Sequence, residues 1–345
     1  MGLSELNSLD SALDRFLQQE ISISTNARQD ASRSQNNLRG ILRGKADKDT
    51  GFPEILVSQD RDFLGGSFAR HTKIWPLDDI DLFLPMDGAG LIYVNNGYVL
   101  PFGVASDGGA RRIGTSRWMT NSYVDSSKIL DGFLASLWDS YPSSKIGVDQ
   151  HCVNLQTTLA ATSESDGIGF DVVPCFLMQP NDGSENFYTV PDGIGGWMRS
   201  NPKKDNEVCA QLQEFHKGTY RHAVRLLKYW NKNEFGDRFQ SYYIELAASK
   251  RFNEYMSAGS AVVHVAQAFA IAFSALTKAH AAGAAKSLVT GAPDVPAPLL
   301  DASQTGFLIA DATRADTAFN AAWTGNDLTT ALTTLNYIFS TSFFQ

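Results

Sequence analysis

Apolar residues recur at helical spacing near the start of the chain. Leucine and phenylalanine side chains from Leu6 to Leu17 fall three or four residues apart, which indicates an amphipathic helix that ends before Ile21. A second, more polar helix is expected over Ala27 to Gly44. Neither has enough apolar surface to be stable alone. We therefore expect both to brace a larger domain.

Short runs of β-branched and aromatic residues predict strands in the middle of the chain. The first core strand is expected over Ile80 to Leu84, after a possible edge strand at Ile55 to Val57 and a helix-like segment over Gln59 to Leu64. Two hairpins are expected: Leu91 to Val94 with Tyr98 to Phe102, and Cys152 to Leu159 with Ile168 to Met178. Residues 88–118 are interpreted as an insertion loop.

Helical spacing returns in the second half of the chain. A helix with apolar positions from Ile129 to Trp138 should stop at Pro142, and residues 188–202 are interpreted as a loop with an exposed Trp197. Later helices are expected from Asn206, through Tyr220 to Trp230, and over 243–255, 258–288 and 328–339, with a linker at 291–298. The length of 345 residues favours two packed lobes.

Composition and charge narrow the class of protein. The net charge of −8 argues against a protein that coats nucleic acid, because phosphate binding needs clustered lysine and arginine. The three cysteines, Cys152, Cys175 and Cys209, are widely spaced, as expected for buried thiols in a reducing compartment. The N-terminus has no apolar signal core, and the alanine-rich stretch 261–277 is interrupted by polar residues. A cytoplasmic protein without a membrane segment is expected.

The stretch from Gly65 to Pro85 carries the candidate chemistry. Gly65 and Gly66 allow the backbone to approach an anion closely, and the amide and hydroxyl of Ser67 can then bind phosphate. Asp79 and Asp81 are two residues apart at the start of a strand, so both carboxylates should point to one face and could bind a divalent cation.

A third acid, Asp171, lies inside a later apolar run, where a charge is costly without a partner. Taken singly, these features also fit a tight turn, a solvated strand edge and a buried acid paired with arginine or a backbone amide. Taken in order, they match the parts of a two-metal phosphoryl-transfer site, in which several carboxylates hold two cations.

These motifs resemble those of a known family. Gly-Gly-Ser-Phe-Ala-Arg-His-Thr at 65–72, Asp-Asp-Ile-Asp-Leu-Phe-Leu at 78–84 and Phe-Asp-Val-Val-Pro at 170–174 are similar to the core motifs of the bacterial CD-NTases. These are the cyclic GMP-AMP synthase-like nucleotidyltransferases of CBASS anti-phage signalling, in the polymerase β superfamily. Residues 225–231 and 241–246 are similar to later segments of that family. The resemblance spans about residues 50–250 and leaves 88–118 unmatched.

The resemblance implies an α+β fold. A polymerase β-like lobe with a mixed sheet and the N-terminal bracing helices would cover 1–200, a helical substrate-binding lobe would cover 201–345, and the active site would lie in the cleft between them. Gly66 and Ser67 would bind the donor triphosphate. Asp79, Asp81 and Asp171 would be catalytic and would hold two Mg²⁺ ions, or Mn²⁺, with Asp171 also near the acceptor ribose hydroxyl.

Three residues of the helical lobe complete the implied nucleotide site. Lys228 and Ser241 would grip the β- and γ-phosphates, and Tyr242 would be a platform for a nucleobase. Each has a plainer alternative: Lys228 as an exposed helix residue, Ser241 as a helix cap and Tyr242 as core packing. Asp78 should face away from the acidic pair.

The implied function is a cyclic oligonucleotide synthase that joins ATP or other NTPs into a cyclic di- or trinucleotide messenger for antiviral defence. A separate effector protein would respond to the product. A linear nucleotide transferase and a non-catalytic nucleotide sensor are the alternatives. No cysteine and histidine cluster has zinc spacing, which, together with the acidic charge, counts against zinc and against direct activation by nucleic acid.

Overall fold

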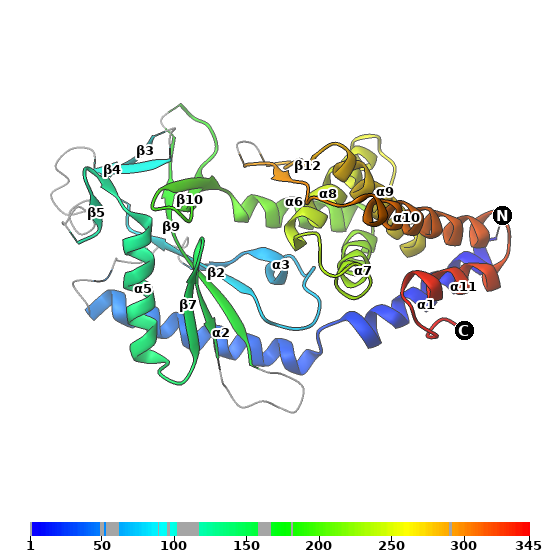
Figure 1. Ribbon diagram of the computed structural model, residues 1–345, viewed down its shortest axis with the longest axis horizontal. Helices are drawn as coiled ribbons and strands as arrows, with labels where there is room; N and C mark the ends of the chain where they lie inside the picture. Colours follow the sequence, from blue (N-terminus) through cyan, green and yellow to red (C-terminus); the bar gives the residue numbers. More distant parts are fainter. Residues whose placement is uncertain are drawn as a thin grey trace. The chain divides into compact units, whose positions relative to one another are not determined.

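The computed structural model has a mixed α+β architecture that divides into two compact units, each described here by itself (Figure 1). The sheet unit comprises residues 24–69 and 76–203, and the helical unit comprises 1–23, 70–75 and 204–345. This division differs from the expected break at 200/201, because the first helix and a short connector group with the helical unit. The structure describes residues 2–48, 52, 62–88, 90–94, 97–101, 117–157, 167–180, 182–289 and 292–345.

A seven-stranded mixed sheet forms the centre of the sheet unit. Its path runs β1-β2-β9-β10-β11, and β8 pairs with both β9 and β7. Strand β9 lies parallel to β2 and antiparallel to β8 and β10, so the sheet is mixed as expected. The strands are β1 (Phe63–Leu64), β2 (Ile80–Met86), β7 (Lys145–Asp149), β8 (Cys152–Gln156), β9 (Gly169–Met178), β10 (Phe187–Pro191) and β11 (Trp197–Ser200).

Two helices of the sheet unit contact each other, and one of them packs on the sheet (Figure 1). Helix α5 (Ser126–Ser140) packs on β7 and β8 through an apolar face that includes Ile129 and Phe133, and it ends before Pro142 as predicted. Helix α2 (Thr25–Lys48) contacts α5. It is also tied to the residue before β1, because Arg39 and Arg43 both form ion pairs with the buried Asp62, at 2.8 and 2.5 Å.

The segment 188–202 is a β-hairpin, so its interpretation as a loop with an exposed Trp197 was wrong. Strands β10 and β11 pair antiparallel, and the side chain of Trp197 is 1% exposed, with its indole N–H donating to the carbonyl of Val124 at 2.8 Å. The carboxylate of Asp192 accepts the amides of Ile194 and Gly196 and so closes the turn. Glycine-rich turns between short strands hide the strand pattern from sequence reading.

Smaller strands complete the sheet unit and test two further predictions. The hairpin over 91–94 and 98–101 is present as β3 (Leu91–Val94) and β4 (Tyr98–Pro101), and β5 (Met119–Thr120) pairs with β6 (Tyr123–Val124). The segment predicted as helix-like before the glycine turn ends as strand β1 instead. The expected edge strand at 55–57 lies outside the described residues.

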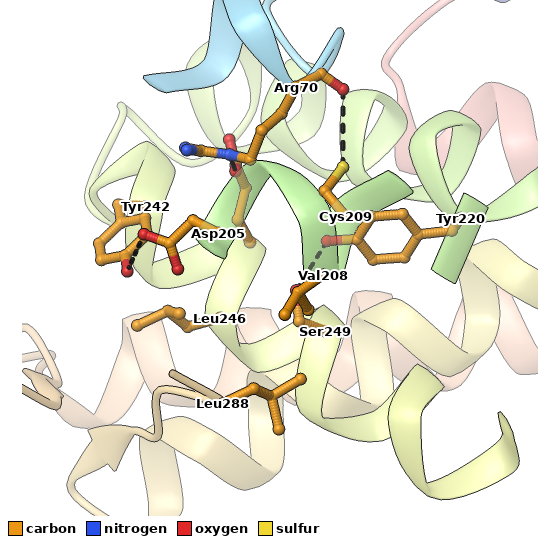
Figure 2. A pocket seen from close by; sticks show the side chains of 10 residues that line it. Arg70, Asp205, Val208, Cys209, Tyr220, Tyr242, Leu246, Ser249 and Leu288 are labelled. Atoms are coloured by element: carbon orange, nitrogen blue, oxygen red, sulfur yellow. Dashed lines mark hydrogen bonds and ion pairs between the residues drawn. The ribbon is translucent and has the colours of Figure 1, made fainter. Parts of the chain in front are cut away.

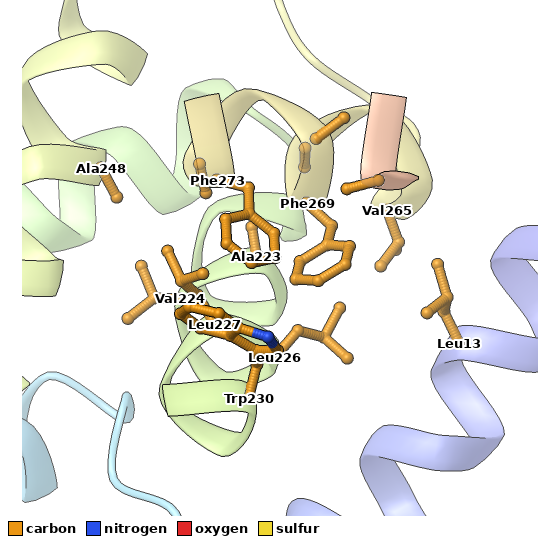
Figure 3. Close-up of a cluster of buried hydrophobic side chains, with 14 of the residues drawn as sticks. Leu13, Ala223, Val224, Leu226, Leu227, Trp230, Ala248, Val265, Phe269 and Phe273 are labelled. Carbon is orange, nitrogen blue, oxygen red and sulfur yellow. The ribbon is translucent and has the colours of Figure 1, made fainter. Parts of the chain in front are cut away.

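The helical unit is built around a large apolar core. Figure 3 shows Trp230 of α7 against Phe269 and Phe273 of α9, with Leu13 contributed by α1. The first helix therefore packs into this core, which explains its amphipathic pattern. The helices of this unit are α1 (Leu3–Phe16), η1 (Leu17–Ile21), α6 (Pro202–Phe215), α7 (Thr219–Asn233), α8 (Ser241–Ser257), α9 (Val265–Ala281), α10 (Ala302–Trp323) and α11 (Leu328–Ile338).

Two helices differ from expectation. The long helix expected over 258–288 is shorter, as α9, and short strands β12 (Ala284–Ala285) and β13 (Val295–Pro296) follow it. Helix α10 was missed, although it begins with a capping box in which Asp301 and Gln304 bond each other's backbone amides. In the described part of the chain, no helix combines the length and apolarity needed to span a bilayer.

His216 gives the helical unit a pH-dependent stability. Its imidazole is fully buried, Nδ1 accepts the amide of Val262 at 3.0 Å, and burial lowers its pKa. Below the ordinary value of about 6.5 the unfolded chain takes up a proton that the folded chain resists, so stability falls as pH falls, by at most about 1.4 kcal/mol per pH unit. In urea titrations from pH 7.5 to 5.5, His216→Gln should show a shallower fall than the wild type; equal slopes would contradict this role.

Candidate active site

The glycine turn packs directly on strand β2. The amide of Gly65 donates to the carbonyl of Asp81 at 3.1 Å, and a Cβ at Gly65 would lie 2.3 Å from the ring of Phe83. Gly66 has φ +59°, and a Cβ there would lie 1.6 Å from Oδ2 of Asp81. Both glycines are therefore required by close approach, and the second also by its backbone conformation. Ser67, in the short α3 (Gly66–Ala69), is buried beside them.

A polar row crosses three neighbouring strands beneath this turn. Asp81 of β2 is the register partner of Asp171 of β9, and Asp171 is in turn the partner of Asn154 of β8. Register partners on adjacent strands point to the same face. The amide of Asn154 donates to Oδ1 of Asp171 at 2.8 Å. The predicted third carboxylate is thus brought next to the first pair by the sheet itself.

Together with burial, the negative charge of this row raises the pKa of a neighbouring thiol. The pKa of Cys152 is raised by burial and, further, by the negative charge of Asp171, Asp149 and Asp81. All three cysteines are free and buried, so the expectation of buried thiols is confirmed.

Oxygen donors of this kind suit a hard divalent cation. Asp79 directly precedes β2, and the partial burial of Asp79, Asp81 and Asp171 leaves each in reach of solvent. Within the residues described, no three acidic, histidine or cysteine side chains already converge as a ligand set. The in-register pair Asp81 and Asp171 fits Mg²⁺ in donor type, and Asp79 is close in sequence to Asp81 of this pair.

The other predicted residues lie in the helical unit. Lys228 of α7 is only 3% exposed, so the alternative of an exposed helix residue is wrong. Its ammonium donates to Oε1 of Glu245 on α8 at 2.5 Å. Arg70 Nε donates to Oε2 of the same carboxylate at 2.5 Å, and the hydroxyl of Thr72 donates to Oε1 at 2.8 Å. Burial alone would raise the pKa of Glu245, but the charges of Arg70 and Lys228 outweigh it and lower the pKa to about 2.

Ser241 and Tyr242 open helix α8. The N-cap is Gln240 and Ser241 is exposed, so the alternative of Ser241 as the cap does not hold. The hydroxyl of Tyr242 donates to Oδ2 of Asp205 at 3.0 Å, and the guanidinium of Arg70 lies 5.6 Å from the centre of the tyrosine ring. Burial, and then the charge of Asp205, raise the pKa of Tyr242. Tyr242 is therefore held by polar contacts as well as by packing.

A small cavity lies beside Tyr242. Figure 2 shows Arg70, Asp205 and Tyr242 at one side of it and Cys209 and Tyr220 at the other. Its volume of about 20 Å³ is room for about one water molecule, far less than a nucleobase needs. A base that stacks on Tyr242 would therefore use the ring from outside this cavity.

Several polar residues of the site were not predicted. Glu245 lies within the 241–246 motif and Arg70 within the 65–72 motif, and neither was given a role. Asn154 and Asp205 were not singled out at all. Glu245 is a lone acid in an apolar helical run, and Asn154 is a polar residue between the apolar neighbours Val153 and Leu155, so each carried a signal like the one that marked Asp171.

The turn geometry predicts a graded effect of adding a methyl group. Gly66→Ala combines a positive φ with a clash against Asp81, whereas Gly183→Ala, in the same unit, combines φ +77° with open space. We expect Gly183→Ala to cost about 1 kcal/mol of unfolding free energy and Gly66→Ala about 1–3 kcal/mol more. Urea denaturation measures both variants. Equal losses would show that the approach of Gly66 to Asp81 is not tight.

The chain is similar to known proteins in sequence and in structure. No protein-family model matches the chain. It is 29% identical over 238 residues to the probable cyclic nucleotide synthase IK1_05630 of Bacillus cereus (strain VD146), which covers 68% of this chain and 69% of that protein. In structure it is similar to CdnC of E. coli MS115-1 with ATP, at a TM-score of 0.63 and 18% identity over 97% of this chain and 98% of that one.

A second structure, of CdnC from the same strain in complex with a HORMA protein, gives a TM-score of 0.61 at 18% identity, with the same coverage. CdnC is a CD-NTase with a polymerase β-like fold, so the expected fold class is confirmed. The resemblance to the bacterial CD-NTases, predicted from the glycine turn and the three acids, is likewise confirmed, by a probable cyclic nucleotide synthase in sequence and by CdnC in fold.

Proposed function

We propose that this protein is a nucleotidyltransferase that joins NTPs into a cyclic oligonucleotide. The observation that carries the proposal is the register of β2 and β9, which places Asp81 beside Asp171 directly under the Gly66 turn. The 29% identity to a probable cyclic nucleotide synthase supports the same assignment. The chemistry needs acids next to a backbone that can approach phosphate, and the sheet unit has both.

The reaction would be attack by a ribose hydroxyl oxygen of one nucleotide on the α-phosphorus of an NTP. The new bond joins that oxygen to phosphorus, the bond from phosphorus to the β-phosphate oxygen breaks, and pyrophosphate leaves. Repetition with the second hydroxyl would close a ring. Two Mg²⁺ ions, when bound by Asp79, Asp81 and Asp171, would supply charge neutralisation for the attacking and leaving oxygens.

The residues of the chain have separate tasks in this scheme. Asp171, held by the amide of Asn154, would take the proton of the attacking hydroxyl or favour its loss. Gly66, which lies against Asp81, and the next residue, Ser67, would approach the donor phosphates. From the helical unit, Lys228 and Ser241 would bind the β- and γ-phosphates and Tyr242 would stack on a base. The cyclic product would act as a messenger for a separate effector in antiviral defence.

Removal of one carboxylate charge tests the metal assignment. Asp81→Asn and Asp171→Asn should each lower turnover by about 10² or more, because several kcal/mol of charge stabilisation are lost while the fold is kept. Asp78→Asn is the matched control, since Asp78 is an exposed neighbour of the same strand. The purified protein is incubated with four labelled NTPs and Mg²⁺ or Mn²⁺, treated with phosphatase, and the resistant products are weighed.

Each outcome of that assay has a distinct meaning. Near-normal turnover by Asp81→Asn would refute the metal assignment. A wild-type product of linear mass, with a terminal phosphate that phosphatase removes, would replace the proposal by a linear transferase. NTP binding without pyrophosphate release would replace it by a nucleotide sensor.

Two substitutions of Tyr242 test the roles of its ring and of its hydroxyl separately. Tyr242→Phe keeps the ring and loses the hydrogen bond to Asp205, so the choice of nucleotide should stay the same. Tyr242→Ala loses the stacking surface, worth about 1–3 kcal/mol per base, and should change the ratio of NTPs used more than the metal dependence. Competition between the four NTPs measures that ratio. An unfolded Tyr242→Ala, seen by circular dichroism, would favour the core-packing role.

A further inference from the structure

One buried carboxylate in the helical unit accepts hydrogen bonds from three side chains on two separate segments. Both oxygens of Glu245, on α8, are used: Oε2 by Arg70, and Oε1 by Thr72 and by Lys228 of α7. The four side chains are between 0% and 7% exposed. The contacts are short, at 2.5–2.8 Å, as is usual for charge-assisted hydrogen bonds.

The charges in this cluster are unequal. Arg70 and Lys228 are two cations on one carboxylate, so the three ionised groups together carry one positive charge. A buried ion cluster of this kind is often no more stabilising than apolar packing of the same volume. A lysine ammonium buried without an anion would tend to lose its proton. Glu245 therefore supplies an anion to the ammonium of Lys228 in a place where burial works against a charge.

The same carboxylate also fixes the chain that leaves the glycine turn. Arg70 and Thr72 follow Ser67 in sequence and belong to the connector 70–75, which packs with the helical unit. The backbone carbonyl of Arg70 accepts the thiol of Cys209 at 3.6 Å, a second attachment of the connector to this unit. Glu245 thus holds both a candidate phosphate ligand and the segment next to the candidate phosphate turn.

We infer that Glu245 is a positioning residue for triphosphate binding, which acts by holding Lys228 charged and in one orientation and by fixing the connector through Arg70 and Thr72. This inference rests on the proposed function, since it assigns Glu245 a part in the NTP site. Glu245 itself would not touch the nucleotide. Its loss should weaken the hold on the β- and γ-phosphates more than it slows the chemical step.

The decisive variant is Glu245→Gln, which keeps the size and removes the charge. We expect KM for NTP to rise about tenfold or more and kcat to change less than about threefold, because a ground-state phosphate contact is weakened. Inhibition by tripolyphosphate, which has no base or sugar, should weaken by the same factor. Glu254→Gln is the matched control: it lies on the same helix, pairs with Arg251 at the surface and should leave both constants unchanged.

A double variant tests whether Glu245 acts through Lys228. If it does, Glu245→Gln added to Lys228→Met should raise KM by less than about twofold beyond Lys228→Met alone. If Glu245 had only a structural role, the effects of the two substitutions on KM would instead multiply, and a smaller fraction of the purified protein would be active. If Glu245→Gln does not fold, Thr72→Val takes its place, since it removes one hydrogen bond to Oε1 and should raise KM about threefold.

Calorimetric titration with tripolyphosphate separates failure of this inference from failure of the proposed function, because it needs no turnover. Binding by the wild type that weakens about tenfold in Glu245→Gln supports the inference even if no cyclic product is found. Equal binding by the two proteins, an unchanged KM in Glu245→Gln or Thr72→Val, or no binding by the wild type would overturn it, whatever the product.

Discussion

The parallel pairing of β2 and β9 is the constraint on which the candidate catalytic site depends. Asp81 and Asp171 are far apart in sequence, and only the register of these two strands makes them neighbours. A slip of one residue would turn one of the two carboxylates to the opposite face of the sheet. The register is fixed by apolar side chains of β2 that are fully buried, such as Leu82 and Leu84. Packing of ordinary core residues thus sets the geometry of the acids.

The glycine turn depends on the same strand. It is held by a backbone hydrogen bond to Asp81 and by contact with Phe83, so its position follows from β2 and not from its own short helix. The turn, the two acids and the supporting amide are therefore all attached to neighbouring strands of the sheet unit. This explains why the motif needs glycine at two successive positions: one is required for the aromatic ring and one for the carboxylate.

The local features of the site could be predicted from the sequence, and its long-range contacts could not. The glycine turn, the spacing of Asp79 and Asp81 and the isolated Asp171 are visible within short windows, because they depend on backbone freedom and strand alternation. The contacts around Lys228 are not visible in this way. Lys228 bonds Glu245, and Glu245 meets Arg70 and Thr72 only when helix and connector pack together. The resemblance motif singled out Lys228 as a candidate but gave no sign of its burial.

The fold shows the same division. Strongly periodic helices such as α5 were predicted with the correct end, whereas the hairpin around Trp197 was not, because its strands are short and its turn is rich in glycine. Helix α10 was missed for a different reason. Its apolar positions are mostly alanine, including Ala315, Ala318 and Ala322, which bury well but give a weak hydrophobic signal. Its capping box was the better indicator.

The burial of Lys228 bears on its proposed role as a phosphate ligand. An exposed lysine would bring a mobile, hydrated charge to the triphosphate and would lose side-chain entropy on binding. Lys228 has already lost that freedom in the folded protein, because Glu245 fixes its ammonium. The entropy cost of ordering the Lys228 side chain is then part of the folding of the helical unit. The large apolar core around Trp230 and Phe273 stabilises that unit enough to offset this cost. The preorganised cation, rather than the number of contacts, would determine how firmly the phosphates are held.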